Sequence, residues 1–177
     1  MIVKHDRMTA IEDKIVTKDE LGRKLYLWNM QGHKIVFTNG CFDILHRGHA
    51  EYLAKAANEG NVLIVGINSD ASVKRLGKNS SRPLQDENSR AFLIASLDMV
   101  EAVIIFDEDT PLELIKFIQP QVLIKGADYD ANEKDPKNKK FIVGSDVVTS
   151  RGGIVKTVEF LEGYSTSAIE EKIRSGK

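Results

Sequence analysis

The stretch Thr38-Asn39-Gly40-Cys41-Phe42-Asp43-Ile44-Leu45-His46-Arg47-Gly48-His49 decides the fold of this chain. It follows the apolar run Ile35-Val36-Phe37 and precedes Ala50-Glu51-Tyr52-Leu53-Ala54, a layout typical of a strand, a glycine-bearing turn and a helix. A helix N-terminus exposes unpaired N–H groups and a partial positive charge, so it favours phosphate. Two imidazole donors beside that end would add directed hydrogen bonds. The segment therefore predicts a nucleotide-phosphate site.

Apolar strand patterns alternate with helical patterns along the rest of the chain. We expect strands at 34–38, 61–68, 101–106, 122–125 and 154–160, separated by helices. This alternation predicts an α/β fold, a Rossmann-like, doubly wound parallel sheet of about five strands with flanking helices. Ligands bind beyond the carboxyl ends of such strands, where the strand order reverses. The turn after the first strand and the loops after Asn68 and Lys125 should therefore converge.

Length and composition indicate one globular domain. The 177 residues carry a formal net charge of −1, so no basic field points to nucleic acid, and the apolar runs are too short for a membrane span. We expect a flexible leader at 1–16, followed by a single domain at 17–177 that begins with a helix capped by Thr17. The only cysteine, Cys41, fits a reducing compartment, which predicts a cytoplasmic protein.

Two common phosphate motifs are absent from the sequence. No G-x-G-x-x-G follows the first strand, and Gly77-Lys78 lacks the upstream glycine of a P-loop. A zinc site built from Cys41, Asp43, His46 and His49 is an alternative, which would make the chain a metal-dependent hydrolase. Arg47 would add positive charge inside that group, which disfavours it. We expect no metal held by protein ligands alone, and packing rather than catalysis for Cys41.

The segment T-N-G-C-F-D-I-L-H-R-G-H resembles the signature of the HxGH nucleotidyltransferases, the cytidylyltransferase-like superfamily. Gly163-Tyr164-Ser165-Thr166-Ser167 resembles the G-x-S-T-[ST] turn that opens their last helix. Between them, Asn68-Ser69-Asp70, Arg82-Pro83 and Lys125-Gly126-Ala127-Asp128-Tyr129 resemble the D-glycero-β-D-manno-heptose 1-phosphate adenylyltransferases. The resemblance runs from about Leu21 to the C-terminus. In many such relatives this domain follows a sugar kinase, whereas here it stands alone.

The resemblance implies a reaction between MgATP and a sugar 1-phosphate that gives an ADP-sugar and pyrophosphate. Relatives that transfer cytidylyl groups often carry Arg-Thr before the glycine of the last motif, where this chain has Leu161-Glu162. A cytidylyltransferase that acts on glycerol 3-phosphate or a similar ester remains the alternative. A third alternative is a module that binds a nucleotide as a sensor and does not turn it over. Exposed apolar residues on the N-terminal helix would suit the interface of a homodimer, which is a further alternative.

Catalytic and nucleotide-binding roles follow from helix-start chemistry and from the resemblance. His46 and His49 would donate to the α- and β-phosphates, and the start of the last helix, with a capping-box pattern of Ser167 and Glu170, would bind the β- and γ-phosphates. Lys125 ends an apolar strand, so we expect an anionic partner for it. Asp43 would hold Mg²⁺ or cap the turn. The predicted nucleotide-binding residues are Thr38, Asn39, Gly40, Phe42, Asp43, Gly48, Arg90, Gly126, Tyr164, Ser165, Thr166 and Ser167, with adenine near Lys125, Gly126 and Tyr164.

Basic and polar residues after the second and fourth strands are candidates for binding the acceptor. Lys74, Arg75, Lys78 and Arg82 follow the second strand, at the end where ligands bind. Each would equally suit a solvated surface loop, and Arg82 is preferred because Pro83 fixes the direction of its loop. The predicted acceptor-binding residues are Asn68, Asp70, Lys74, Arg82, Asp128 and Tyr129.

Overall fold

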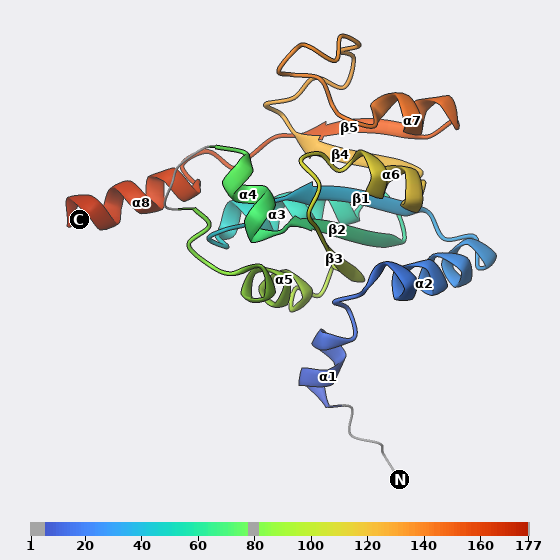
Figure 1. Cartoon of the computed structure of the whole chain (residues 1–177), viewed down its shortest axis with the longest axis horizontal. Coiled ribbons are helices and arrows are strands. Elements are labelled where there is room, and N and C mark those ends of the chain that lie inside the picture. The colour runs from blue at the N-terminus through green and yellow to red at the C-terminus, as the bar shows by residue number, and fades with distance from the viewer. Residues whose placement is uncertain (1–5, 78–81, 177) are drawn as a thin grey trace.

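A computed structural model describes residues 6–77 and 82–176, so the candidate Lys78 lies outside the described residues. Its centre is a five-stranded parallel sheet in the order β3-β2-β1-β4-β5 (Figure 1). The strands are β1 (Ile35–Gly40), β2 (Val62–Asn68), β3 (Ala102–Phe106), β4 (Val122–Gly126) and β5 (Ile154–Val158). The predicted doubly wound α/β sheet is confirmed. The order reverses between β1 and β4, which sets the expected ligand position at their carboxyl ends.

Helices cover both faces of this sheet. They are α1 (Arg7–Glu12), α2 (Lys18–Met30), α3 (Arg47–Ala57), α4 (Asp70–Arg75), α5 (Glu87–Ala95), α6 (Leu112–Ile118), α7 (Ser145–Ser150) and α8 (Thr166–Ser175). Residues of α2, α6 and α7 form one buried cluster with one face of the strands. Residues of α3 and α5 form a second cluster with the opposite face. Because successive strand residues point to opposite faces, Phe37 joins the first cluster and Val36 the second.

The N-terminal segment departs from the expected flexible leader. Residues 7–12 form α1, Ile15 pairs in parallel with Val103, and Val16 is buried. The backbone N–H of Val103 donates to Lys14 O, and that of Val16 donates to Val103 O. Residues 14–16 therefore cover the open edge of β3 and belong to the folded domain. Sequence patterning missed this because a short stretch beside an edge strand has no periodicity of its own.

The C-terminal helix lies outside the layers that cover the sheet. Figure 1 shows α8 extending away from the sheet, and it contains no buried residue. Its first residues nevertheless lie beside the turn that follows β1, as described below. The carboxyl ends of the central strands thus lie near the N-terminal end of α8, a helix that buries no residue.

Candidate active site

The carboxyl ends of β1 and β4 are linked by a lysine. Lys125 Nζ donates to Asn39 Oδ1 at 3.2 Å and lies 4.8 Å from the centre of the Tyr129 ring. An amide oxygen and an aromatic face are thus among the partners of Lys125 within the protein. The ammonium group therefore lies at the switch point of the sheet, where an entering phosphate can compete for it.

The turn between β1 and α3 is held in one conformation by packing. Phe42 adopts a left-handed backbone conformation (φ 48°), which is uncommon for a residue with a Cβ. Its ring lies edge-on to His49 with the ring centres 5.2 Å apart, and it packs against Gly40, where a Cβ would lie 3.0 Å from the ring. Phe42 is thus a buried support for His49, which does not match its predicted contact with the nucleotide.

The two signature histidines form a stacked pair. Their ring centres lie 3.8 Å apart with 18° between the planes. His46 also caps α3, because its Nδ1 accepts from the backbone N–H of His49 at 3.3 Å. An Nδ1 that accepts leaves the proton of a neutral imidazole on Nε2, so that nitrogen is the one available to donate to a ligand.

Burial keeps both imidazoles neutral at physiological pH. Desolvation lowers the pKa of His46, and it lowers the pKa of His49 to about 4, with a further decrease from His46 and an opposing effect from the backbone of Ile44. A neutral imidazole still donates one N–H, so the pair can bind developing negative charge without carrying a full charge of its own. This matches the predicted role as paired hydrogen-bond donors.

The second motif meets the first at Gly48. A Cβ on Gly48 would lie 3.0 Å from His46 Nδ1 and 3.2 Å from the Cβ of Tyr164. Arg47 places its guanidinium 5.6 Å from the centre of the Tyr164 ring. The expected meeting of the two motifs is therefore found.

The start of α8 contributes a helix N-terminus to this site. Ser165 caps the helix by accepting from the backbone N–H of Ala168 at 3.1 Å, and Thr166 and Ser167 form its first turn. The predicted capping box of Ser167 and Glu170 is wrong. Glu170 Oε1 instead accepts from Arg82 Nη2 at 2.5 Å. This bond ties Arg82, in the predicted acceptor loop, to α8.

Asp43 connects the signature turn to the loop that carries Arg82. The carboxylate is 2% exposed, and its Oδ1 accepts from the backbone N–H groups of Leu84 and Gln85. Asp43 Oδ2 and Gln85 Oε1 are buried without a hydrogen-bond partner among the described residues. An oxygen left in this state fits a Mg²⁺ ion that arrives with ATP, since Mg²⁺ commonly uses one or two carboxylates together with substrate phosphates.

Arg90 is one of the residues that we expected to contact the nucleotide. Arg90 is completely buried, and its guanidinium donates to the carbonyl oxygens of Cys41, Gln85 and Asn68 and to Asp70 Oδ1. Through these contacts Arg90 cross-links three loops beside the site, which gives it a structural role. Asp70, which was expected to bind the acceptor, is the ion-pair partner of this arginine.

Thr38 and Asn68 are likewise occupied inside the protein. The Thr38 hydroxyl is buried and hydrogen-bonded to the Tyr52 hydroxyl at 2.7 Å. The Asn68 side chain is buried and donates to Ser72 Oγ at 3.0 Å. Their side chains support the floor of the site and do not face a ligand. Sequence reasoning could not separate these roles, because polar residues at strand ends serve both purposes.

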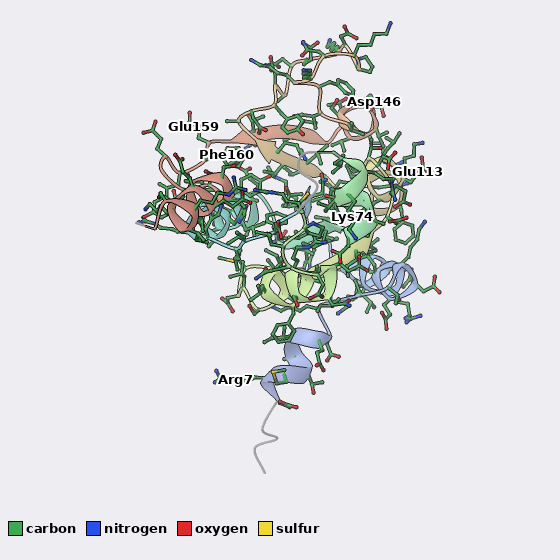
Figure 2. All side chains as sticks on the ribbon, turned by 60° about the vertical axis from the view of Figure 1, so that its left-hand side comes forward. Arg7, Lys74, Glu113, Asp146, Glu159 and Phe160 are labelled. Carbon is green, nitrogen blue, oxygen red and sulfur yellow. The ribbon has the colours of Figure 1, made fainter. Side chains whose placement is uncertain are left out.

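The remaining acceptor candidates are spread around the site. Asp128 and Tyr129 follow β4, and burial raises the pKa of the Tyr129 hydroxyl, with smaller effects from Asp128 and Cys41. Lys74 is exposed on α4 (Figure 2), and nothing in the described contacts ties it to the site. Arg75 is bound to Asp107 and Asp109, which favours a surface role. Cys41 is half-buried with Sγ 4.0 Å from Asn68 Oδ1, in keeping with packing.

One residue beside the site carried no signal in the sequence. The Phe160 ring lies against Gly126, where a Cβ would be 2.5 Å from Phe160 Cε2 and still nearer to Cζ. Figure 2 shows Phe160 next to Glu159, where the chain leaves β5 toward α8. A single aromatic residue after a strand is ordinary, so only the spatial arrangement identifies it.

The alternative zinc site finds no support in this geometry. Within residues 6–77 and 82–176, no group of three or more His, Cys, Asp or Glu side chains is arranged to hold a metal ion. His46 and His49 stack face to face, and Asp43 is committed to the backbone of another loop. The arrangement instead provides hydrogen-bond donors, a lysine and a helix N-terminus, which is chemistry for polyphosphate.

Comparison with known proteins decides the family. The family described as cytidylyltransferase-like matches residues 37–172, which includes both motifs. The chain belongs to this family. It is therefore a nucleotidyltransferase, as its signature predicts, and the five-stranded sheet is the fold expected of one.

Several relatives resemble this nucleotidyltransferase along nearly its whole length. It is 51% identical to "Bifunctional protein HldE" of Campylobacter jejuni over 99% of this chain and 34% of that protein. It is also 51% identical to the protein of the same name from Geotalea uraniireducens, over 92% of this chain and 31% of that protein. The chain thus spans about a third of the length of these curated relatives.

A solved structure supports the same grouping. The lipopolysaccharide core biosynthesis protein of Thermoplasma volcanium is 29% identical, with a TM-score of 0.57, and the match covers 76% of this chain and all of that one. In the part of the chain that the structure describes, no helix is long and apolar enough to cross a membrane.

Proposed function

We propose that this nucleotidyltransferase transfers an adenylyl group from MgATP to a sugar 1-phosphate, with D-glycero-β-D-manno-heptose 1-phosphate as the favoured acceptor. The products would be ADP-heptose and pyrophosphate. The observation that carries the proposal is the stacked His46–His49 pair beside the N-terminus of α8, two groups of anion donors from opposite ends of the sequence. The identity of about half to proteins named HldE supports the choice of a heptose substrate.

The reaction needs positioning more than acid–base chemistry. A phosphate monoester is mostly dianionic at neutral pH because its second pKa is about 6, so the acceptor oxygen needs no general base. That oxygen attacks the α-phosphorus of ATP, the bond from this phosphorus to the bridging oxygen of the β-phosphate breaks, and pyrophosphate leaves with that electron pair. The protein must hold two anions in line and spread the charge that develops.

Each group of residues has a role in this scheme. His46 and His49 donate from their imidazole N–H groups to the α- and β-phosphates, where charge accumulates. The first turn of α8 binds the β- and γ-phosphates, and Lys125 shifts from Asn39 to a phosphate oxygen. When bound, Mg²⁺ neutralises phosphate oxygens, and Asp43 Oδ2 is the buried oxygen suited to it.

Arg82 and the loop after β4 would recognise the acceptor. Arg82 is bound to Glu170, so a phosphate that enters beside α8 can exchange with this carboxylate. Asp128 and Tyr129 lie next to Gly126, in position for sugar or ribose hydroxyls, and adenine would lie against the backbone of Gly126. A cytoplasmic location, where the nucleotide is available, remains a prediction from the single cysteine.

Release of pyrophosphate by the purified protein tests the proposal. ATP and CTP are each combined with heptose 1-phosphate and with glycerol 3-phosphate in the presence of Mg²⁺. Release with ATP and the heptose phosphate alone supports the proposal. Release with CTP and glycerol 3-phosphate would replace it with the cytidylyltransferase alternative, and nucleotide binding without release for any acceptor would favour a sensing module.

A further inference from the structure

The last residue of β4 has an aromatic ring directly against its backbone. Gly126 has no side chain, and a Cβ there would collide with the ring of Phe160, 2.5 Å from Cε2. The ring of Tyr52 lies 5.8 Å from that of Phe160 and tilts by 34°. The Tyr52 hydroxyl donates to Ile124 O and is bonded to Thr38, so this floor is fixed. The Phe160 ring thus lies on the bare backbone of Gly126 beside the fixed ring of Tyr52, and we call the space that it occupies the slot.

The edges of this slot are more polar than a phenyl ring requires. Asp128 Oδ1 would lie 2.7 Å from a Cβ placed on Gly126, and Lys125 directly precedes Gly126 in the chain. A phenyl ring offers no hydrogen-bond donor to the Asp128 carboxylate, whereas a nucleoside offers amino and hydroxyl donors to it. The slot therefore matches a flat ring with polar substituents better than it matches its present occupant.

The position of Phe160 allows its ring to move away from Gly126. It is 50% exposed, and it belongs to the segment 159–165 between β5 and α8, which is neither helix nor strand. Gly163 in this segment adopts a left-handed conformation (φ 79°), and the following helix has no buried residue. Moving the ring out of the slot therefore removes no residue from the buried clusters, although it uncovers the ring of Tyr52.

We propose that Phe160 occupies the base slot of the ligand-free protein and competes with adenine for the backbone of Gly126, so that it sets the affinity for the nucleotide. This inference rests on the proposed function, which places adenine at Gly126. The apparent dissociation constant equals the intrinsic one divided by the fraction of molecules whose slot is open. A ring that fills the slot about nine-tenths of the time weakens binding by about tenfold.

Binding of MgATP without acceptor, measured by titration calorimetry, tests this inference. The Phe160→Ala protein should bind MgATP about tenfold more tightly than the unchanged chain. Ile154→Ala is the matched control, because Ile154 is similarly exposed (46%) but is the first residue of β5, whereas Phe160 follows the other end of that strand. Inorganic tripolyphosphate, which has no base, should bind all three proteins equally.

The possible results distinguish a failure of this inference from a failure of the proposed function on which it rests. Equal MgATP affinity for the unchanged and Phe160→Ala proteins would overturn the competition and leave adenylyl transfer standing. Weaker binding by Phe160→Ala would also overturn it, because the ring would then be a stacking partner. No MgATP binding by either protein would overturn the proposed function and this inference with it.

A fluorescent reporter gives a second reading that does not depend on removing the ring. Trp28 is the only tryptophan of the chain, so Trp28→Phe combined with Phe160→Trp leaves one indole in the slot. MgATP should shift its emission to longer wavelength as the ring moves into water, while tripolyphosphate should not. An emission spectrum that MgATP leaves unchanged at saturation contradicts the displacement.

Discussion

The two motifs of the active site are built in opposite ways. The β1–α3 turn is held by buried polar contacts: Arg90 is fully buried with four hydrogen bonds, and Asp43 binds two backbone N–H groups of another loop. The segment 159–176 contains α8, which buries no residue, and it contacts the rest of the site through the Phe160 ring, Tyr164 and the pair of Glu170 with Arg82.

This difference separates two tasks. Stabilising a transition state requires donors whose positions are fixed before the substrate arrives, because ordering them during the reaction would cost free energy. Admitting a nucleotide and releasing products requires a part of the site that can move. The firmly held turn should therefore respond to substitution differently from the loosely held C-terminal segment.

The largest expected effect is on stability, at Arg90. Replacing Arg90 with Ala leaves Asp70 and three carbonyl oxygens without this donor, and breaking such a network around a fully buried guanidinium costs about 3–5 kcal/mol. Urea unfolding measures this change. Arg174→Ala on α8 is the matched control and should change the free energy of unfolding by less than about 0.5 kcal/mol. Similar values for the two variants would mean that the turn is not held by Arg90.

The next effect is on turnover, at the histidines. His46→Asn and His49→Asn each remove an imidazole donor, and each should lower the rate of pyrophosphate release by about 10²–10³. Asn at position 46 can still cap α3, so the fold should be retained. His33→Asn, at the opposite end of β1, serves as the control and should keep its rate. Near-normal rates for both signature variants would exclude the donor role.

A smaller effect is expected from pH, through His49. Its pKa in the folded chain is about 4, below the ordinary value of 6.5, so the unfolded chain binds more protons between these values. The stabilising contribution is complete above about pH 6.5 and is lost as the pH falls toward 4. Allowing for partial exposure of the ring, the loss should be roughly 1–2 kcal/mol. Unfolding curves at several pH values should show a shallower dependence for His49→Asn, and equal slopes would contradict the neutral buried imidazole.

The smallest effect comes from comparing two serine caps. Ser69 caps α4 beside the core, and Ser165 caps α8. Ser69→Ala should cost about 1 kcal/mol of global stability, as is usual for a lost cap. Ser165→Ala should change global unfolding by less than about 0.5 kcal/mol, because α8 unfolds locally at little cost to the rest. A larger loss for Ser165→Ala would show that α8 is part of the cooperative core.

The sequence predicted the sheet, the switch point and the meeting of the two motifs. Buried parallel strands leave nearly continuous apolar runs, and two histidines around a glycine at a helix start form a specific pattern, His46-Arg47-Gly48-His49. It did not predict which polar residues face inward: Arg90, Thr38 and Asn68 were expected at the ligand and instead hold the protein together. A hydrogen-bond partner that is distant along the chain leaves no local pattern.

The position of Phe160 was unpredictable for the same reason. Its contact with Gly126 depends on the path of the chain after β5, and neither residue alone indicates the other. Residues 14–16 show the same limit, since their pairing with β3 requires the edge of the sheet to be known first. Local sequence patterns thus predicted the strands and helices. Contacts between distant segments, which decide which parts of the site are firmly held, were visible only in the structure.

The most direct test of this account is amide hydrogen exchange with and without saturating MgATP. The account predicts that residues 38–49 are protected from exchange in both states, whereas residues 159–175 exchange rapidly alone and become protected when the nucleotide is bound. Slow exchange of the C-terminal segment without nucleotide, or a change confined to the β1–α3 turn, would contradict it.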